Sequence, residues 1–150
     1  MTHLEFQPQT AETPAPLKRG RLRFTGFKFE RTAHGDVRVE VELEWMEGVK
    51  IKGTASGQSS PTVDLRIAAE AALRAIETFS EGALAFELVG VKHVRAFDAN
   101  VIIVAIGNKR NEEPQRLLGA YLVESDPARG AVVAVLGATN RVLGNFIATR

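Results

Sequence analysis

The residues that could do chemistry in this chain are few, and they form no known catalytic arrangement. His3, His34 and His93 lack the spacing of metal ligands, and the absence of cysteine excludes disulfides, thiolate metal sites and cysteine nucleophiles. Ser59 and Ser60 have no identifiable histidine and acid partners, and a serine followed by proline is a common helix start. We therefore expect no catalytic residue, no metal site and no cofactor.

A loop of small residues is the best candidate for ligand binding. Free backbone N–H groups in a glycine-rich loop before a helix can bind an anionic group such as a carboxylate. The stretch 56–60 precedes a predicted helix and could supply such donors, although it lacks the Gly-Lys pair of a phosphate-binding P-loop. The candidate ligand-binding residues are Gly53, Ser56, Gly57, Ser59 and Ser60.

Three glutamates, Glu40, Glu42 and Glu44, alternate with apolar residues between 37 and 45. A period of two predicts a strand with one buried face and one wet face. After a short turn, Lys50 and Lys52 follow in register, so that Glu44 faces Lys50 and Glu42 faces Lys52. We interpret the acidic row as a solvated sheet face with cross-strand ion pairs, in preference to a cation site or a site for a basic partner.

The elements that position these residues occur twice. Aligning Gly119 with Gly53 also aligns Asp126 with Ser60 and Pro127 with Pro61, and each copy reads as strand, break and helix. Upstream, Gly90 aligns with Gly26, and a glycine inside a strand pattern indicates a β-bulge. The sequence predicts an α+β fold made of a duplicated β-β-β-α unit, with antiparallel sheets and helices on one face of each. The repeats are about 21–80 and 84–146.

The middle strand of the second copy, residues 101–106, has apolar residues at both its odd and its even positions. In the middle strand of the first copy, glutamates occupy the even positions. A strand that is apolar on both sides is normally covered on both sides, and one helix layer covers only one. We expect a second chain to cover the other face, most simply in a two-fold homodimer. A core closed within one chain is the alternative. The expected interface residues are Ile102, Val104, Ile106, Tyr121 and Val135.

Composition places the chain among ordinary soluble domains. Its 150 residues suit a single domain at 21–150, preceded by a proline-containing flexible leader at 1–20. A net charge of +1 gives no reason to expect nucleic acid as the main partner. The first ten residues lack the pattern of a secretion signal, and no uninterrupted apolar run approaches the ~20 residues of a membrane span. We expect a cytoplasmic protein without a membrane partner.

Two helix starts carry a resemblance to a known family. The first is the stretch 57–64, Gly-Gln-Ser-Ser-Pro-Thr-Val-Asp, followed by Ala68, Ala69, Ala72 and Ile76; the second is Asp126 with Ala131, Ala134, Ala138, Thr139 and Asn140. Together they resemble the C-terminal regulatory domain of 2-isopropylmalate synthase and citramalate synthase, here without the catalytic barrel. The resemblance implies a dimer that binds an amino-acid effector, leucine or isoleucine, near the loops between third strand and helix.

Three hypotheses for function follow. The first is a non-catalytic, oligomerising accessory or regulatory protein that binds a partner protein. The second is a free-standing sensor of a small molecule, such as a branched-chain amino acid or a related acid, with its pocket at the loop ending in Ser60. The third is an enzyme, for which the sequence offers no constellation, and we expect the protein not to be one.

Overall fold

The computed structural model describes residues 22–46, 48–109 and 115–149, so the predicted leader lies outside the described residues. The first unit contains β1 (Leu22–Arg31), the 3₁₀ turn η2 (Ala33–Gly35), β2 (Asp36–Trp45), β3 (Val49–Gln58) and α3 (Pro61–Phe79). The second contains β4 (Phe86–Ala96), β5 (Ala99–Asn108), β6 (Gln115–Val123) and α4 (Pro127–Ala148). The strands form two antiparallel three-stranded sheets, which confirms the predicted α+β fold of two β-β-β-α units.

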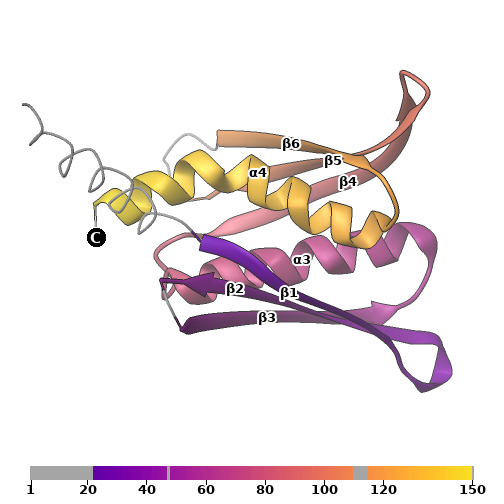
Figure 1. Ribbon diagram of the computed structural model, residues 1–150, viewed down its shortest axis with the longest axis horizontal. Coiled ribbons are helices and arrows are strands. Elements are labelled where there is room, and N and C mark those ends of the chain that lie inside the picture. Colours follow the sequence, from indigo (N-terminus) through magenta and orange to yellow (C-terminus); the bar gives the residue numbers. More distant parts are fainter. Residues whose placement is uncertain (1–21, 47, 110–114, 150) are drawn as a thin grey trace, which may run out of the picture.

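The two helices lie between the two sheets (Figure 1). We call the sheet β1-β2-β3 sheet A and the sheet β4-β5-β6 sheet B. Helix α3 packs on β2 and β3, helix α4 packs on β5 and β6, and α3 also contacts α4 and β4. Each sheet therefore turns one face toward the helices and leaves the other face, which we call its outer face, on the outside of the molecule.

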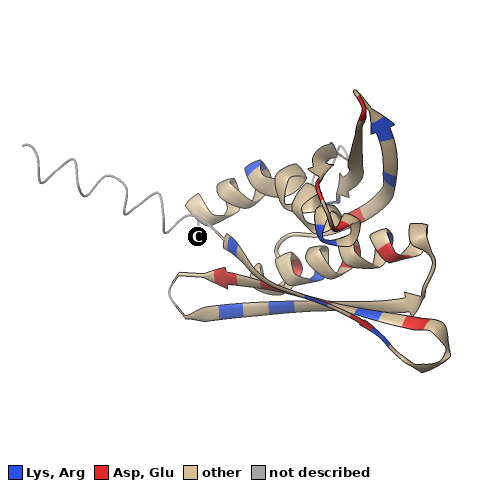
Figure 2. Cartoon of the chain, turned by 45° about the vertical axis from the view of Figure 1, so that its right-hand side comes forward, with Lys and Arg blue, Asp and Glu red and all other residues tan. Residues whose placement is uncertain are grey.

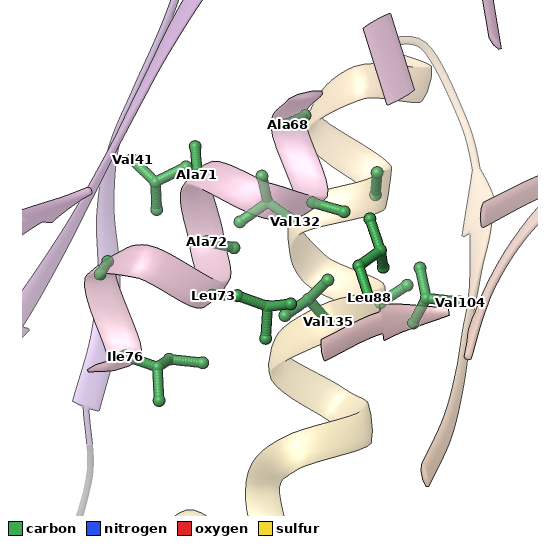
Figure 3. Close-up of a cluster of buried hydrophobic side chains, with 14 of the residues drawn as sticks. Val41, Ala68, Ala71, Ala72, Leu73, Ile76, Leu88, Val104, Val132 and Val135 are labelled. Carbon is green, nitrogen blue, oxygen red and sulfur yellow. The ribbon is translucent and has the colours of Figure 1, made fainter. Parts of the chain in front are cut away.

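Each helix begins at the residue that its sequence predicts. The side chain of Ser60 caps α3 by accepting a hydrogen bond from the backbone of Val63, and Asp126 caps α4 in the same way. In both helices proline occupies the first turn, where its missing N–H leaves no gap in the hydrogen bonding. The buried residues of the two helices meet in one hydrophobic core that both units share, as Figure 3 shows for Leu73, Val132 and Val135.

Aromatic rings join the two units near the C-terminal ends of the helices. The Phe79 ring of α3 lies 5.4 Å from the Trp45 ring of β2 and 6.0 Å from the Phe146 ring of α4, measured between centroids. Both contacts are tilted or edge-on, which is the favoured geometry for aromatic pairs. Phe79 therefore connects sheet A to the second helix.

A glycine in the third strand of each sheet allows its helix to approach closely. A methyl group on Gly53 would overlap the carbonyl oxygen of Ala71 and the backbone nitrogen of Ala75 in α3. On Gly119 it would overlap the carbonyl oxygen of Ala134 and lie 2.9 Å from the Cβ of Ala138 in α4. The two glycines that align in the sequence thus do the same structural work in both units.

Both predicted bulges are present, and one predicted strand is longer than expected. The register of β1 with β2 shifts between Phe24 and Gly26, and that of β4 with β5 shifts between Leu88 and Gly90. Strand β3 continues through the predicted loop to Gln58, because residues up to Asp36 of β2 remain opposite it. Only Ser59 and Ser60 separate this strand from the helix.

Polar side chains of α3 occupy backbone groups at the neighbouring sheet edges. Arg74 donates to the carbonyl oxygen of Thr54 on β3 at 2.7 Å, and Arg66 donates to that of Leu88 on β4 at 3.4 Å. The carboxylate of Glu77 accepts a hydrogen bond from the N–H of Phe86. The central helix is therefore bonded to both sheets through their edge strands, β3 and β4.

We predict that the close approach of α4 to β6 cannot accommodate one added methyl group. Gly119→Ala should lower the free energy of unfolding by about 1–3 kcal/mol, because helix backbone atoms would have to move. Gly137→Ala is the control: Gly137 is exposed in the same helix with nothing within 4 Å of the added carbon, and it should raise stability by up to about 1 kcal/mol. Urea unfolding measures both, and a neutral Gly119→Ala would contradict the packing.

Candidate functional site

The structure separates the five predicted ligand-binding residues instead of gathering them into one loop. Gly53 lies in β3 beneath α3, where it serves helix packing. Ser56 and Gly57 also lie in β3, opposite Arg38 and Val37 of β2, so they are strand residues and not loop residues. The expected run of free backbone donors before the helix is thereby reduced to Ser59 and Ser60.

Hydroxyl groups of these two serines are engaged within the chain. Ser60 caps α3. Ser59 donates to the carboxylate of Asp64 at 2.8 Å and accepts from the guanidinium of Arg31 at 2.8 Å, and that guanidinium lies 3.8 Å from the same carboxylate. The backbone N–H of Ser59 is bonded to the carbonyl oxygen of Gly35. The connection between β3 and α3 is thus held by its own side chains.

An open hollow of about 620 Å³ lies beside Gly53, between β3 and the C-terminal half of α3. Its charged lining includes Arg74 and Glu77, whose head groups already bond to Thr54 and Phe86. The hollow therefore has a polar lining, but its Arg74 and Glu77 side chains are already hydrogen-bonded to backbone groups of the chain.

The histidines and acidic residues form no metal-binding cluster in the described part of the chain. No three His, Asp or Glu side chains there come close enough to hold a metal ion. His93 pairs with Ile102 in the ladder between β4 and β5, as expected from its alignment with Phe29. His34 lies in the exposed turn between β1 and β2.

The outer face of sheet A is wet and internally paired. The predicted register is confirmed, with Glu44 opposite Lys50 and Glu42 opposite Lys52. The ion pairs run diagonally: Lys50 contacts Glu42 at 3.6 Å and Lys52 contacts Glu40 at 3.6 Å. Strand twist brings diagonal neighbours within reach of long side chains. Figure 2 shows the lysines as blue bands along β3 and glutamates as red bands on β2.

Sheet B has a largely apolar outer face, which we call the open face. Its strand β5 contains no charged residue, and Val101, Ile103 and Ala105 point outward between Lys92 and Val94 of β4 and the leucines of β6. Ile103 is 37% exposed, Leu118 is 69% exposed and Leu122 is 55% exposed. Apolar side chains gathered on one exposed surface indicate a contact surface, whereas scattered ones do not.

The predicted interface residues lie on the core side of sheet B or, in one case, in α4. Ile102, Val104 and Ile106 of β5 are fully buried beneath the helices, and Val135 of α4 is fully buried in the core. Tyr121 faces inward, since a Cβ added to Gly130 of α4 would lie 3.1 Å from its ring. None of the first four side chains is available to a second chain while this protomer stays folded.

A one-residue difference between the hairpins explains this reversal. The sequence alignment places Ile103 on Val39, but the structure pairs Gly119 with Val104 and Gly53 with Val41, which places Ile102 on Val39. The β4–β5 hairpin is one residue shorter than the β1–β2 hairpin, as the pairs Arg95–Asn100 and Arg31–Val37 show. A slip of one residue moves every side chain to the other face of a strand.

The β4–β5 hairpin extends the open face beyond Val94 and Val101 to Ala96 and Ala99. At its tip, Phe97 is completely exposed and has a φ of 54°, in the left-handed region that bulky residues rarely adopt. A two-residue hairpin turn with positive φ at both positions normally carries Asn or Gly. The tip therefore holds an aromatic ring in water at a conformational cost.

Comparison with known proteins adds no assignment. No protein-family model matches the chain, and no curated protein matches its sequence. The resemblance to the regulatory domain of 2-isopropylmalate synthase therefore remains a prediction.

Helix α4 is the one helix in the described ranges that is long and apolar enough to cross a membrane by length and composition. Its mean hydropathy reaches 1.4 over the most apolar stretch, of which 33% is buried. The same helix packs on β5, β6 and α3, and core helices of soluble proteins can be equally long and apolar. The expectation of no membrane partner stays a prediction.

We predict that Ser60 contributes to stability as a helix cap. Ser60→Ala should lower the free energy of unfolding by about 1 kcal/mol, because a backbone N–H of the first turn loses its acceptor. Ser56→Ala is the matched control, since Ser56 is an exposed strand residue, and it should change stability by less than about 0.5 kcal/mol. Chemical denaturation measures the free energy of unfolding of both variants. If Ser60→Ala were as stable as Ser56→Ala, the proposed capping role of Ser60 would be contradicted.

Proposed function

We propose that this chain is a non-catalytic accessory or regulatory protein that oligomerises, most simply as a homodimer, through the open face of sheet B. One observation carries the proposal: the two units have the same fold, but the outer face of one sheet is charged and that of the other is largely apolar. Burial of apolar surface is the main driving force of protein association.

The size of the open face suits a reversible contact. Four rows of residues on three strands cover roughly 400 Å² at the usual strand spacings. Two such faces bury about 800 Å², which is below the roughly 1,200–2,000 Å² of stable protein interfaces and in the range of weak, transient ones. The hairpin ending in Phe97 adds surface at one end of this face. We therefore expect a dimer that dissociates on dilution.

A partner protein would meet the remaining surfaces of such a dimer. Because the helices separate the two sheets, pairing through sheet B leaves both copies of sheet A on the outside. Their charged side chains are the accessible recognition surface in this arrangement. Such an arrangement fits an accessory or regulatory role that does not require an active site, and we propose that this role is in the cytoplasm.

A small-molecule sensor is the alternative, and the structure offers it less support. The serine hydroxyls predicted to bind a ligand are bonded within the chain, and Gly53 faces the helix. A ligand carboxylate would have to displace these interactions.

For the accessory protein we expect no stabilisation by branched-chain amino acids or the related 2-keto and 2-hydroxy acids. A thermal-shift screen with each compound in large excess is the measurement, because binding at a hundredfold excess over Kd would add about 2.7 kcal/mol. A saturable rise in Tm with one compound would favour the sensor instead.

We predict that Leu118→Asp converts the oligomer into a folded monomer. Leu118 is 69% exposed in the protomer, so a charge there costs little in the monomer but would be desolvated in the pair. Sedimentation velocity over a range of concentrations measures the mass, and circular dichroism checks the fold. A wild-type chain that is monomeric at every concentration would refute the proposed oligomer.

Two further variants provide controls for this experiment. Val49→Asp places the same charge on an apolar residue of sheet A that is 50% exposed, and it should leave the mass of the oligomer unchanged. Ile102→Glu should unfold the protein instead of dissociating it, because Ile102 is fully buried in the protomer.

A further inference from the structure

The open face has its own pattern of charge, which restricts how a second copy can lie on it. At one end of the face, Glu87 of β4 and Arg116 of β6 flank Gly107 of β5 in the same row. Both side chains are exposed, and neither forms an ion pair with a side chain in the described part of the chain. Two strand spacings separate their Cα atoms by about 10 Å across Gly107, and no ion pair joins their side chains within the protomer.

Two sheets that pack face to face through a two-fold axis can do so in two main ways. With the axis nearly along the strands, β5 lies over β5 of the second copy, and β4 lies over β6. Rows then meet their own counterparts, so Glu87 of one copy meets Arg116 of the other, twice per dimer. With the axis across the strands, the opposite ends of the face meet, and these two charges lie against Val94 and Leu122.

Side-chain sizes agree with the first arrangement. It places Leu118, the most exposed leucine of the face, against the bulge of β4, where Gly90 has no side chain and the 45% exposed Val89 adds an apolar neighbour. It places Lys92 over Ala120, whose small side chain leaves room for the lysine stem to reach solvent at the edge. Along the centre, Val101, Ile103 and Ala105 each meet their own copies, which gives a continuous apolar seam.

We propose that the occupant of the open face is a second copy of this chain, related by a two-fold axis nearly parallel to the strands, with Glu87 of each copy opposite Arg116 of the other. This geometry rests on the proposed function, because it requires that sheet B be the association surface. It adds the orientation and the register of the two sheets in the dimer. It also assigns Glu87 and Arg116 as the residues that select this orientation and register. Long side chains span the offset that the usual rotation of about 30° between packed sheets introduces.

A mixing experiment with charge-reversed chains tests this geometry. E87R alone and R116E alone each turn both predicted pairs into repulsions, so each homodimer should weaken by roughly tenfold. In a mixture of the two variants, the mixed dimer has attractive pairs at both positions. Native mass spectrometry should therefore find mixed dimers well above their statistical half, and the double variant E87R/R116E should dimerise like the wild type.

Matched charge controls distinguish this pairing from general attraction. K50E changes the net charge as R116E does, but it lies on the outer face of sheet A, so E87R mixed with K50E should show no such excess. An equal excess with K50E would overturn the assigned pair. A dimer that Leu118→Asp dissociates, but whose charge reversals act independently, would overturn the orientation and keep the proposed function. A monomeric wild type would overturn both.

Discussion

The contact between a helix and a glycine in the third strand determines the spacing of the whole molecule. At Gly53 the backbone of α3 rests on β3, and at Gly119 the backbone of α4 rests on β6. Close approach lets the alanine-rich faces of both helices bury against the sheets, while Leu73, Val132 and Val135 lie between the helices. Two helices can then share one core between two sheets, and Phe79 closes that core at one end.

Much of this architecture could be predicted because it depends on local patterns. Alternation from Val37 to Trp45 determines the buried and wet faces of β2, and Ser60 and Asp126 mark the helix starts. Glycines at 26 and 90 identify the bulges, and the charge order along β2 and β3 predicts their register. Each of these signals comes from residues that are near one another in the chain or on adjacent strands.

The candidate site was less predictable because it depends on tertiary context. Gly53 and Gly57 resemble a ligand loop in sequence, but only the position of α3 shows that Gly53 is needed for packing. The apolar character of β5 correctly suggests that one of its faces lacks a cover, yet both parities are apolar, so the pattern cannot tell which face is open. The β4–β5 hairpin is one residue shorter than its counterpart, and this determines which face of β5 is open. As a result Ile103, and not Ile102, faces outward.

Because the outer faces of sheets A and B differ, association through sheet B is expected to stop at the dimer. Once two copies have covered their apolar faces, the surfaces that remain on the two sides are ladders in which Glu40, Glu42 and Glu44 are already matched by cations of the same chain. Such a ladder offers a third copy neither apolar area nor unmatched charge. Growth into stacks or fibres is therefore disfavoured, and the assembly limits its own size without any capping partner.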